Sequence, residues 1–449
     1  MAGPRPSGAD HVPLNDHEAS VLVAARLGRE PQDALEAAVA LEAWGGLPAE
    51  EALACALRVV AAIDPAAPRP TPLHALAVSD QSFAIGDVGF VFGVLFTGFW
   101  VSRLAVELGD RGVDRAWRIA LPLSLGIQWF FRRRYLSGPD GLGRLRSHAQ
   151  TVFAPLVLLL GAIGILIRPG GWLAAGLTIV WVGGFVLAQR GWGLGFGASL
   201  VAGALVLKVG IAAPTLVAIA VVAVICAAAI ALSTVRSSPR RPGSAARALT
   251  AGLVGAGLGL LLVVEPRFPW NARGALPALT VVPSLLGSLW GGFHMARLWD
   301  VMPQVLVTTT VRKRHEGTAG RLMMRLLVES IARLLLGAGL ISLCVMAWVW
   351  FDGAVTGPDR RIFISLLVAH GVLAVAGLCV ALLEAFGRWA WAIVSVAAGV
   401  LVAVSLGRWA HELTPGVRIT WGAIAALAMA LGPLLALLRE PDRNLAAGL

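Results

Sequence analysis

Long apolar runs dominate this chain and limit the kind of fold that it can adopt. Runs of about 20 apolar residues, the length of helix that crosses roughly 30 Å of hydrocarbon, recur between residues 83 and 437. Overall, 57% of the residues are hydrophobic and only 14% are charged, whereas soluble globular proteins carry about 25% charged residues. The sequence therefore predicts an all-α, polytopic membrane protein.

About twelve runs are long enough to span a membrane. They cover residues 83–107, 116–131, 148–167, 171–188, 192–210, 213–233, 247–265, 276–298, 328–350, 361–385, 389–407 and 418–438. The segment 300–312 is ambiguous, since it can continue the eighth run, cross the membrane shallowly or form a separate short helix.

The N-terminal part has a different pattern. Residues 16–63 are too charged to span a membrane, and their apolar positions recur at the spacing of amphipathic helices. We expect three helices, the first capped by Asp16 and the second closed by Gly45-Gly46. A Pro-rich linker follows at 65–72. Residues 1–75 are thus predicted to form a small cytosolic helical region that docks on the membrane part or on a partner.

The positive charge of the chain lies in short connections between the apolar runs. The net charge is +11, and basic clusters occur at 132–134, 236–247 and 312–314. Basic connections are retained on the cytoplasmic side of membrane proteins. We therefore expect a cytoplasmic (inner) membrane protein with both termini in the cytoplasm. This placement of the arginines also argues against nucleic acid as a partner.

A possible internal repeat is the most informative feature. The pattern G-x-L-x-x-G-F-x-x-x-R-L occurs at 93–104 and again at 287–298. Three more matches follow in the same order, pairing 131–135 with 311–315, 143–145 with 320–322, and 158–162 with 334–338.

The repeat predicts two duplicated bundles, 76–245 and 246–449, that share one orientation and are related by an axis along the membrane normal. With six runs in each bundle, the second bundle would begin at the seventh run. The first matched pair of the repeat instead lies in the first and eighth runs. Either an extra helix separates the bundles or one crossing is missed.

These features resemble those of a known family. An opening run with Gly93, Gly98 and Arg103 is followed by Leu-Gly-Ile-Gln-Trp-Phe-Phe-Arg-Arg-Arg-Tyr at 125–135, a basic segment, and Leu-Leu-Leu-Gly at 158–161. This layout resembles the polysaccharide and lipid-linked oligosaccharide flippases of the MOP superfamily. The resemblance covers roughly residues 85–350, and the N-terminal extension departs from it. It implies a transporter, not an enzyme, that flips a lipid-linked glycan precursor by alternating access.

Ionisable and aromatic side chains within the runs are the candidate site residues, because burying a charge in hydrocarbon is costly. Arg103 and Arg297 occupy matching repeat positions, and their guanidinium forks suit the phosphate oxygens of a head group. The alternative is that both reach to the membrane interface. The predicted site is completed by His294 and Trp290 as substrate contacts and by His370 and Glu384 as groups for proton or ion coupling.

No catalytic residue, metal site or cofactor is predicted, since the chain has no phosphate loop, HExxH, GxSxG or metal-ligand cluster. The expected partners are the lipid-linked glycan, membrane lipids and, through the N-terminal region, glycan-assembly proteins.

Three alternatives remain open. A major-facilitator-type secondary porter of a small solute also has two parallel six-span halves, and residues 140–146 faintly resemble its loop motif. A membrane glycosyltransferase or polymerase needs acidic residues on an external loop, where Asp110 and Asp114 are the best candidates. A scaffold would use its N-terminal helices to recruit a partner.

Overall fold

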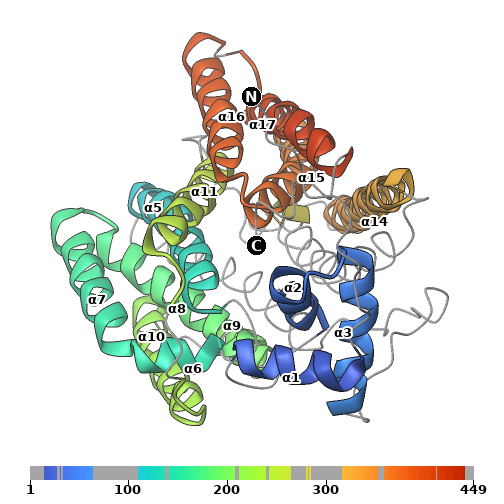
Figure 1. Cartoon of the computed structure of the whole chain (residues 1–449). Helices are drawn as coiled ribbons and strands as arrows, with labels where there is room; N and C mark the ends of the chain where they lie inside the picture. Colours follow the sequence, from blue (N-terminus) through green and yellow to red (C-terminus); the bar gives the residue numbers. More distant parts are fainter. Residues whose placement is uncertain are drawn as a thin grey trace. The chain divides into compact units, whose positions relative to one another are not determined.

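The computed structural model describes residues 15–27, 31, 34–63, 110–136, 141–207, 212–238, 242–263, 280–281, 283–284, 316–351, 358–410 and 412–439, and its regular structure in these ranges is helical (Figure 1). The chain divides into two compact units. The first, the N-terminal unit, comprises Met1–Asp80 and Trp299–Ala319. The second, the membrane unit, comprises Gln81–Leu298 and Gly320–Leu449.

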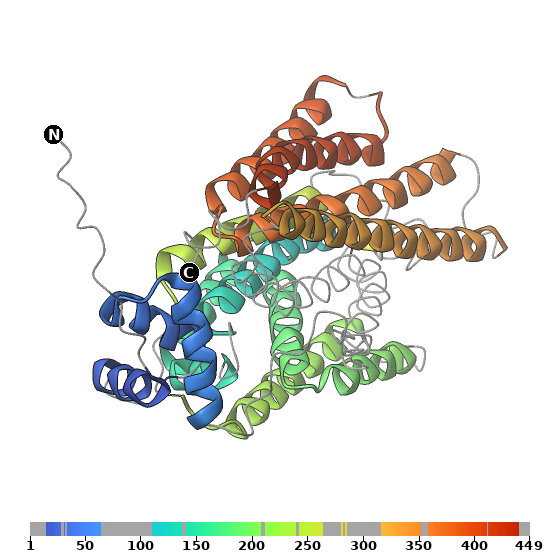
Figure 2. The ribbon, with the colours of Figure 1, turned by 45° about the vertical axis from the view of Figure 1, so that its right-hand side comes forward.

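Three short helices make up the described N-terminal part of the first unit. They are α1 (Asp16–Leu27), α2 (Ala34–Gly45) and α3 (Ala49–Ile63), and each packs against the other two (Figure 2). Small and aliphatic side chains such as Val23, Leu41 and Val59 form their common core. The three amphipathic helices predicted from the sequence are confirmed.

The cap of α1 differs from the prediction by one residue. The Asn15 side chain accepts a hydrogen bond from the backbone N–H of Glu18 (2.8 Å), and the Glu18 carboxylate accepts one from the backbone N–H of Asn15 (3.1 Å). This reciprocal pair is a capping box. Asp16 instead accepts a hydrogen bond from Arg58 of α3 (2.9 Å), so its prediction as the cap is wrong.

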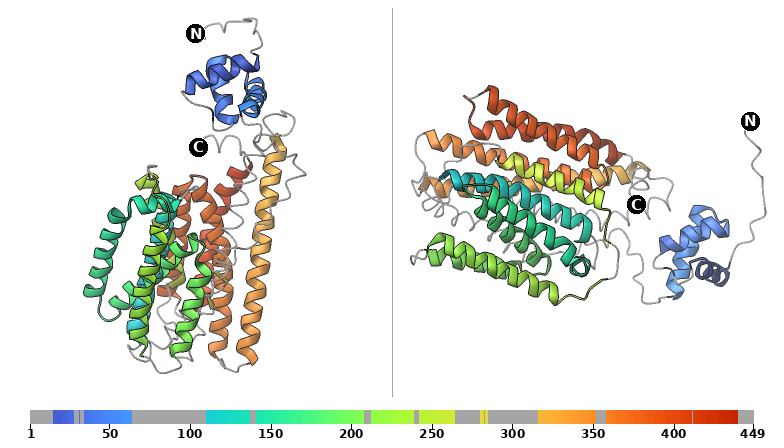
Figure 3. Two further views of the ribbon diagram at one scale, coloured as in Figure 1. Left: turned by 90° about the horizontal axis from the view of Figure 1, so that it is seen from below. Right: turned by 90° about the vertical axis from the view of Figure 1, so that its left-hand side faces the viewer.

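The membrane unit contains the remaining described helices, and its long helices share one general direction (Figure 3). In chain order they are α5 (Asp110–Phe131), the π-helix η2 (Arg132–Leu136), α6 (Gly141–Ser147), α7 (Ala149–Leu166), α8 (Gly171–Gln189), α9 (Gly193–Leu207), α10 (Ala213–Ser233), α11 (Ala245–Val263), α14 (Glu316–Phe351, which begins within the first unit), α15 (Pro358–Ala385), α16 (Trp389–Trp409) and α17 (Pro415–Arg439).

Within the described ranges, eight helices are long and apolar enough to cross a membrane: α7, α8, α10, α11, α14, α15, α16 and α17. With the apolar composition of the chain, they show a multi-pass membrane protein. The predicted runs 83–107 and 276–298 lie largely outside the described residues.

Helix α14 is longer than its predicted run of 328–350. It begins at Glu316 and has 36 residues. The prediction followed hydrophobicity, which is interrupted before residue 328 by charged residues such as Arg325. A helix continues through such residues because its backbone hydrogen bonds do not depend on side-chain polarity.

Two sets of three consecutive helices have the same pattern of contacts. In one set α8, α9 and α10 all touch one another, and in the other α15, α16 and α17 do so. Helix α11 lies between them in the chain and packs against both α5 and α16. We call these sets the first and second triads.

Helices α5 and α11 approach closely because glycines lie on the contact face of α11. A Cβ atom at Gly255 would lie 2.7 Å from the Leu125 carbonyl oxygen and from the Trp129 ring, and one at Gly259 would lie 2.6 Å from the Cα of Pro122. Small residues at such spacing allow membrane helices to pack backbone against backbone.

Candidate functional site

Four of the predicted site residues, Arg103, Trp290, His294 and Arg297, lie outside the described residues. Their proposed contacts with a head group therefore remain predictions. The other two, His370 and Glu384, both lie on α15 and are described.

One end of the membrane unit brings together two of the three basic connections that were predicted to share a side, and the third, at 312–314, lies outside the described residues. The backbone N–H of Gly243 donates to the Arg134 carbonyl (2.7 Å), and Arg134 donates back to the Gly243 carbonyl (2.9 Å). The backbone N–H of Ser238 donates to the Gly143 carbonyl (3.2 Å). We call this the basic end, comprising η2, α6 and the connection 234–244.

Several arginines at the basic end support the backbone. Arg146 donates to the carbonyls of Ser233 (2.8 Å) and Val235, which end α10. Arg144 donates to the carbonyl of Tyr135 (2.9 Å). Since helix ends leave carbonyls without intrahelical partners, these arginines stabilise the connections that carry them. In contrast, Arg132, Arg236 and Arg247 are exposed.

Glu384 lies at the same end and forms an ion pair with Arg133 of η2, with 3.4 Å between Oε1 and Nε. The side chain of Glu384 is 14% exposed and that of Arg133 is 31% exposed. The pair joins two segments 251 residues apart (384 − 133). The sequence predicted a role in proton or ion coupling for this glutamate, and it did not indicate the pairing with Arg133.

His370 is fully buried in the middle of α15. Neither ring nitrogen has a hydrogen-bond partner of good geometry in the described part of the chain. The backbone of Leu366, one turn earlier, and that of Thr280 lie near the ring. An ionisable group inside a membrane helix is a functional candidate, so the coupling role of His370 remains a prediction.

Three charged residues within membrane helices were missed by the sequence analysis. Glu329 and Arg333 form an ion pair one turn apart on α14. Arg418 of α17 is buried and donates to the Leu413 carbonyl (2.7 Å). Their positions inside apolar runs could have identified them, because ionisable residues within membrane helices are functional candidates.

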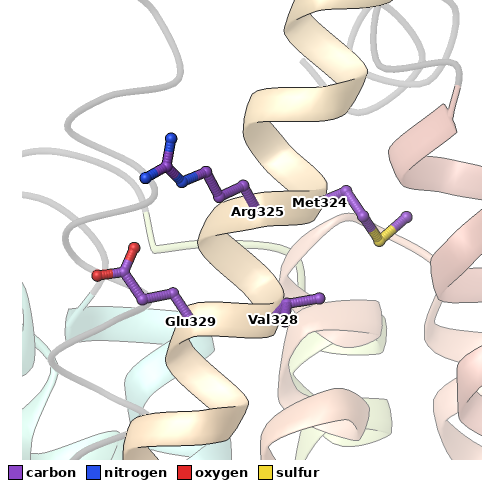
Figure 4. A pocket seen from close by; sticks show the side chains of 4 residues that line it. All are labelled: Met324, Arg325, Val328 and Glu329. Carbon is purple, nitrogen blue, oxygen red and sulfur yellow. The ribbon is translucent and has the colours of Figure 1, made fainter.

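A pocket opens beside α14. Met324, Arg325, Val328 and Glu329 line it, and Figure 4 shows Arg325 and Glu329 projecting together on one side of the helix. Met324 and Val328 project on the other side. The described residues contain no group of three or more His, Cys, Asp or Glu side chains placed to hold a metal ion.

No family model matches this chain, and no curated protein is significantly similar to it. Some solved structures are similar to this chain at low sequence identity. A MOP superfamily transporter from Pyrococcus furiosus, described as having a binding pocket of reverse polarity, is 14% identical with a TM-score of 0.42, over 79% of this chain and 96% of that chain.

Two other solved structures are similar to the same degree. A MATE in complex with MaD5 is 14% identical with a TM-score of 0.45, over 81% of this chain and 96% of that one. An inward-facing multidrug resistance MATE family transporter of the MOP superfamily is 16% identical with a TM-score of 0.38, over 81% of this chain and 98% of that one. TM-scores below 0.5 do not assign the chain to a family.

Proposed function

We propose that this protein is a membrane transporter that works by alternating access between two bundles, 76–245 and 246–449. The repeated triads carry this proposal. At the basic end, Arg190 after α8 donates to Thr234 after α10 (3.4 Å), and Glu384 near the end of α15 pairs with Arg133. Helices α8 and α15 therefore run in the same direction, as expected for parallel repeats.

The repeated sequence segments support the same relation. The segments 143–145 and 158–162 lie in α6 and α7, and their counterparts 320–322 and 334–338 both lie in α14. The α6–α7 pair of the first bundle thus corresponds to the single helix α14 of the second. Two bundles of the same design that enclose a cleft can rock against each other and expose it to each side in turn.

The ion pair between Arg133 and Glu384 is the proposed closing contact at the basic end. It joins η2 of the first bundle to α15 of the second, in addition to the contact between α5 and α11. Arg132 and Arg133 are the charged groups that act on this carboxylate. Protonation of Glu384 would remove its charge and release the pair, which would couple opening to proton binding.

The proposed substrate is a lipid-linked oligosaccharide or polysaccharide precursor that crosses the cytoplasmic membrane. This choice rests on the resemblance of the sequence to MOP superfamily flippases. Arg103 and Arg297, with Trp290 and His294, are the proposed head-group contacts, because guanidinium forks bind phosphate oxygens in bidentate geometry. Both termini are proposed to lie in the cytoplasm, where the N-terminal unit can meet glycan-assembly proteins.

The direct test is export by the variant that carries both Arg103→Ala and Arg297→Ala. We expect lipid-linked intermediates to accumulate inside cells of this variant, as in a deletion strain, while the protein still inserts in the membrane. Arg247→Ala, at an exposed arginine of α11, serves as the control. Wild-type export by the double variant would remove both arginines from the mechanism.

A secondary porter of a small solute is the second candidate, and His370 favours it. A buried imidazole that takes up a proton in each cycle suits proton-coupled exchange. Solute uptake by proteoliposomes that depends on a pH gradient, without movement of a lipid-linked glycan, would select this candidate over the flippase.

A further inference from the structure

Helix α2 of the N-terminal unit exposes large apolar side chains and buries mostly small ones. Its buried residues, which belong to the core shared with α1 and α3, are three alanines and one leucine: Ala37, Ala38, Ala40 and Leu41. On its outer face, Leu35 and Val39 are each 57% exposed. A helix that served only this core would bury such residues, because burial of a Leu or Val side chain is favourable.

The exposed apolar residues of α2 form a stripe along the helix. Leu35, Val39 and Ala43 follow one another at intervals of four, so they lie on one face. Ala43 is exposed like the other two. Apolar residues at this spacing are typical of a helix that packs against another helix or in a groove. We call these three residues the α2 stripe.

The charge beside the stripe is negative. The charged residues of α2 are Glu36 and Glu42, and the helix contains no Lys or Arg. Glu42 is exposed and follows Val39 by about one turn, so it borders the stripe. The helices α1, α2 and α3 together carry six acidic and two basic side chains, a net charge of −4. They thus have the opposite sign to the whole chain, which carries +11.

This charge distinguishes among the surfaces that could cover the stripe. A helix that lies on a bilayer carries Lys and Arg beside its apolar face, because the cytoplasmic leaflet is anionic. The same stripe on a second copy would bring the glutamates of two α2 helices together, and like charges across an interface are unfavourable. A helix with apolar residues on one face and Lys or Arg beside them avoids both costs.

We propose that the α2 stripe is a docking site for a basic amphipathic helix of a partner protein. Apolar residues of that helix cover Leu35 and Val39, and one of its Lys or Arg side chains pairs with Glu42. This inference rests on the proposed function only for the cytoplasmic placement of the N-terminal unit. It adds the face that binds and the chemistry of the partner, and it does not depend on the cargo.

The test measures binding of a labelled synthetic peptide to the full-length protein in nanodiscs of neutral phosphatidylcholine, by fluorescence anisotropy. The probe has five helical turns, about 18 residues, with leucines at intervals of three and four on one face and lysines on the other. Empty nanodiscs and a peptide of the same composition in scrambled order are the controls. We expect saturable binding of the amphipathic peptide and little binding of the scrambled one.

The variant with Leu35→Gln and Val39→Gln tests the stripe itself. It should bind the peptide about tenfold more weakly or worse, because two apolar side chains no longer become buried on binding. Glutamine favours a helix about as well as leucine, and both positions are exposed, so the melting temperature should change little. Val21→Gln is the matched control, since this valine of α1 is 55% exposed and lies outside the stripe. It should keep the wild-type affinity.

Reversal of the charge at Glu42 gives a sharper check. Glu42→Lys should weaken binding of the lysine peptide about fivefold or less, the range of an exposed ion pair. The same variant should bind a peptide with glutamates in place of the lysines more tightly than the wild-type protein does. General damage to the helix would weaken the binding of both peptides.

Several outcomes would overturn the proposal. They are absence of binding by the wild-type protein, equal binding of the scrambled peptide, unchanged affinity in the variant with Leu35→Gln and Val39→Gln, and an equal loss in Val21→Gln. Stripe-dependent self-association, or stripe-dependent binding of anionic vesicles without binding of the peptide, would identify a second copy or the bilayer as the occupant.

The export assay separates this inference from the proposed function. If the stripe binds the peptide as expected but the variant with Arg103→Ala and Arg297→Ala exports normally, the docking site stands and the role of the two arginines fails. If that double variant loses export but the stripe variant binds the peptide normally, the reverse holds.

Discussion

At the scale of single residues, the Arg133–Glu384 pair is the contact most open to test. Glu384→Gln keeps the shape of the side chain and removes its charge, so it mimics the protonated state at every pH. An ion pair that is partly exposed contributes about 1 kcal/mol or less, so we expect the basic end to open up to about fivefold more often. Accessibility of an introduced cysteine at that end, measured with a water-soluble thiol reagent, reports this change.

A double-variant cycle provides the control for this prediction. Arg133→Gln should give the same increase in accessibility, and combining it with Glu384→Gln should add little, because one interaction is removed in all three variants. In the wild-type protein the increase should appear as the pH falls and the carboxylate gains a proton. Strictly additive effects, or an unchanged pH response in Glu384→Gln, would contradict the role of the pair.

At the scale of helices, glycines of α11 let this helix pack closely against α5. Gly255→Ala would place a methyl group 2.7 Å from the Leu125 carbonyl oxygen and from the Trp129 ring. We expect α5 and α11 to separate slightly, at a cost of about 1–3 kcal/mol, the usual penalty of overpacking. The melting temperature of the purified protein in detergent should fall accordingly.

The matched control is Gly377→Ala on α15, where an added Cβ meets no other atom within 4 Å. That variant should melt at or slightly above the wild-type temperature, because alanine favours a helix over glycine by about 0.5–1 kcal/mol. Equal melting temperatures for Gly255→Ala and Gly377→Ala would show that the close contact of α5 with α11 does not limit stability.

At the scale of the whole molecule, the basic end sets the expected orientation in the membrane. In a variant without the native cysteines, we expect Ser237→Cys, in the exposed connection after α10, to react with an impermeant thiol reagent only after cells are opened. Glu412→Cys, exposed between α16 and α17 at the opposite end, should react in intact cells. The reverse pattern of labelling would place both termini outside the cytoplasm.

The sequence by itself determined the class of fold and the approximate position of eight described helices that are long and apolar enough to span the membrane. Run length and charge are local properties, so α8 (Gly171–Gln189) and α10 (Ala213–Ser233) fall within a few residues of their predicted runs. The three N-terminal helices could also be predicted from the sequence, apart from the cap at Asn15. The glycan substrate, which the resemblance of the sequence to MOP superfamily flippases implies, remains a proposal.

Only the tertiary structure decided which residues meet across the membrane unit. The pairing of Arg133 with Glu384 joins positions far apart in the chain, and no periodicity in the sequence encodes such a partner. The contact of Gly255 with the backbone of α5 depends on how two helices cross. These contacts arise from packing, because hydrophobicity places a helix in the membrane without choosing its neighbours.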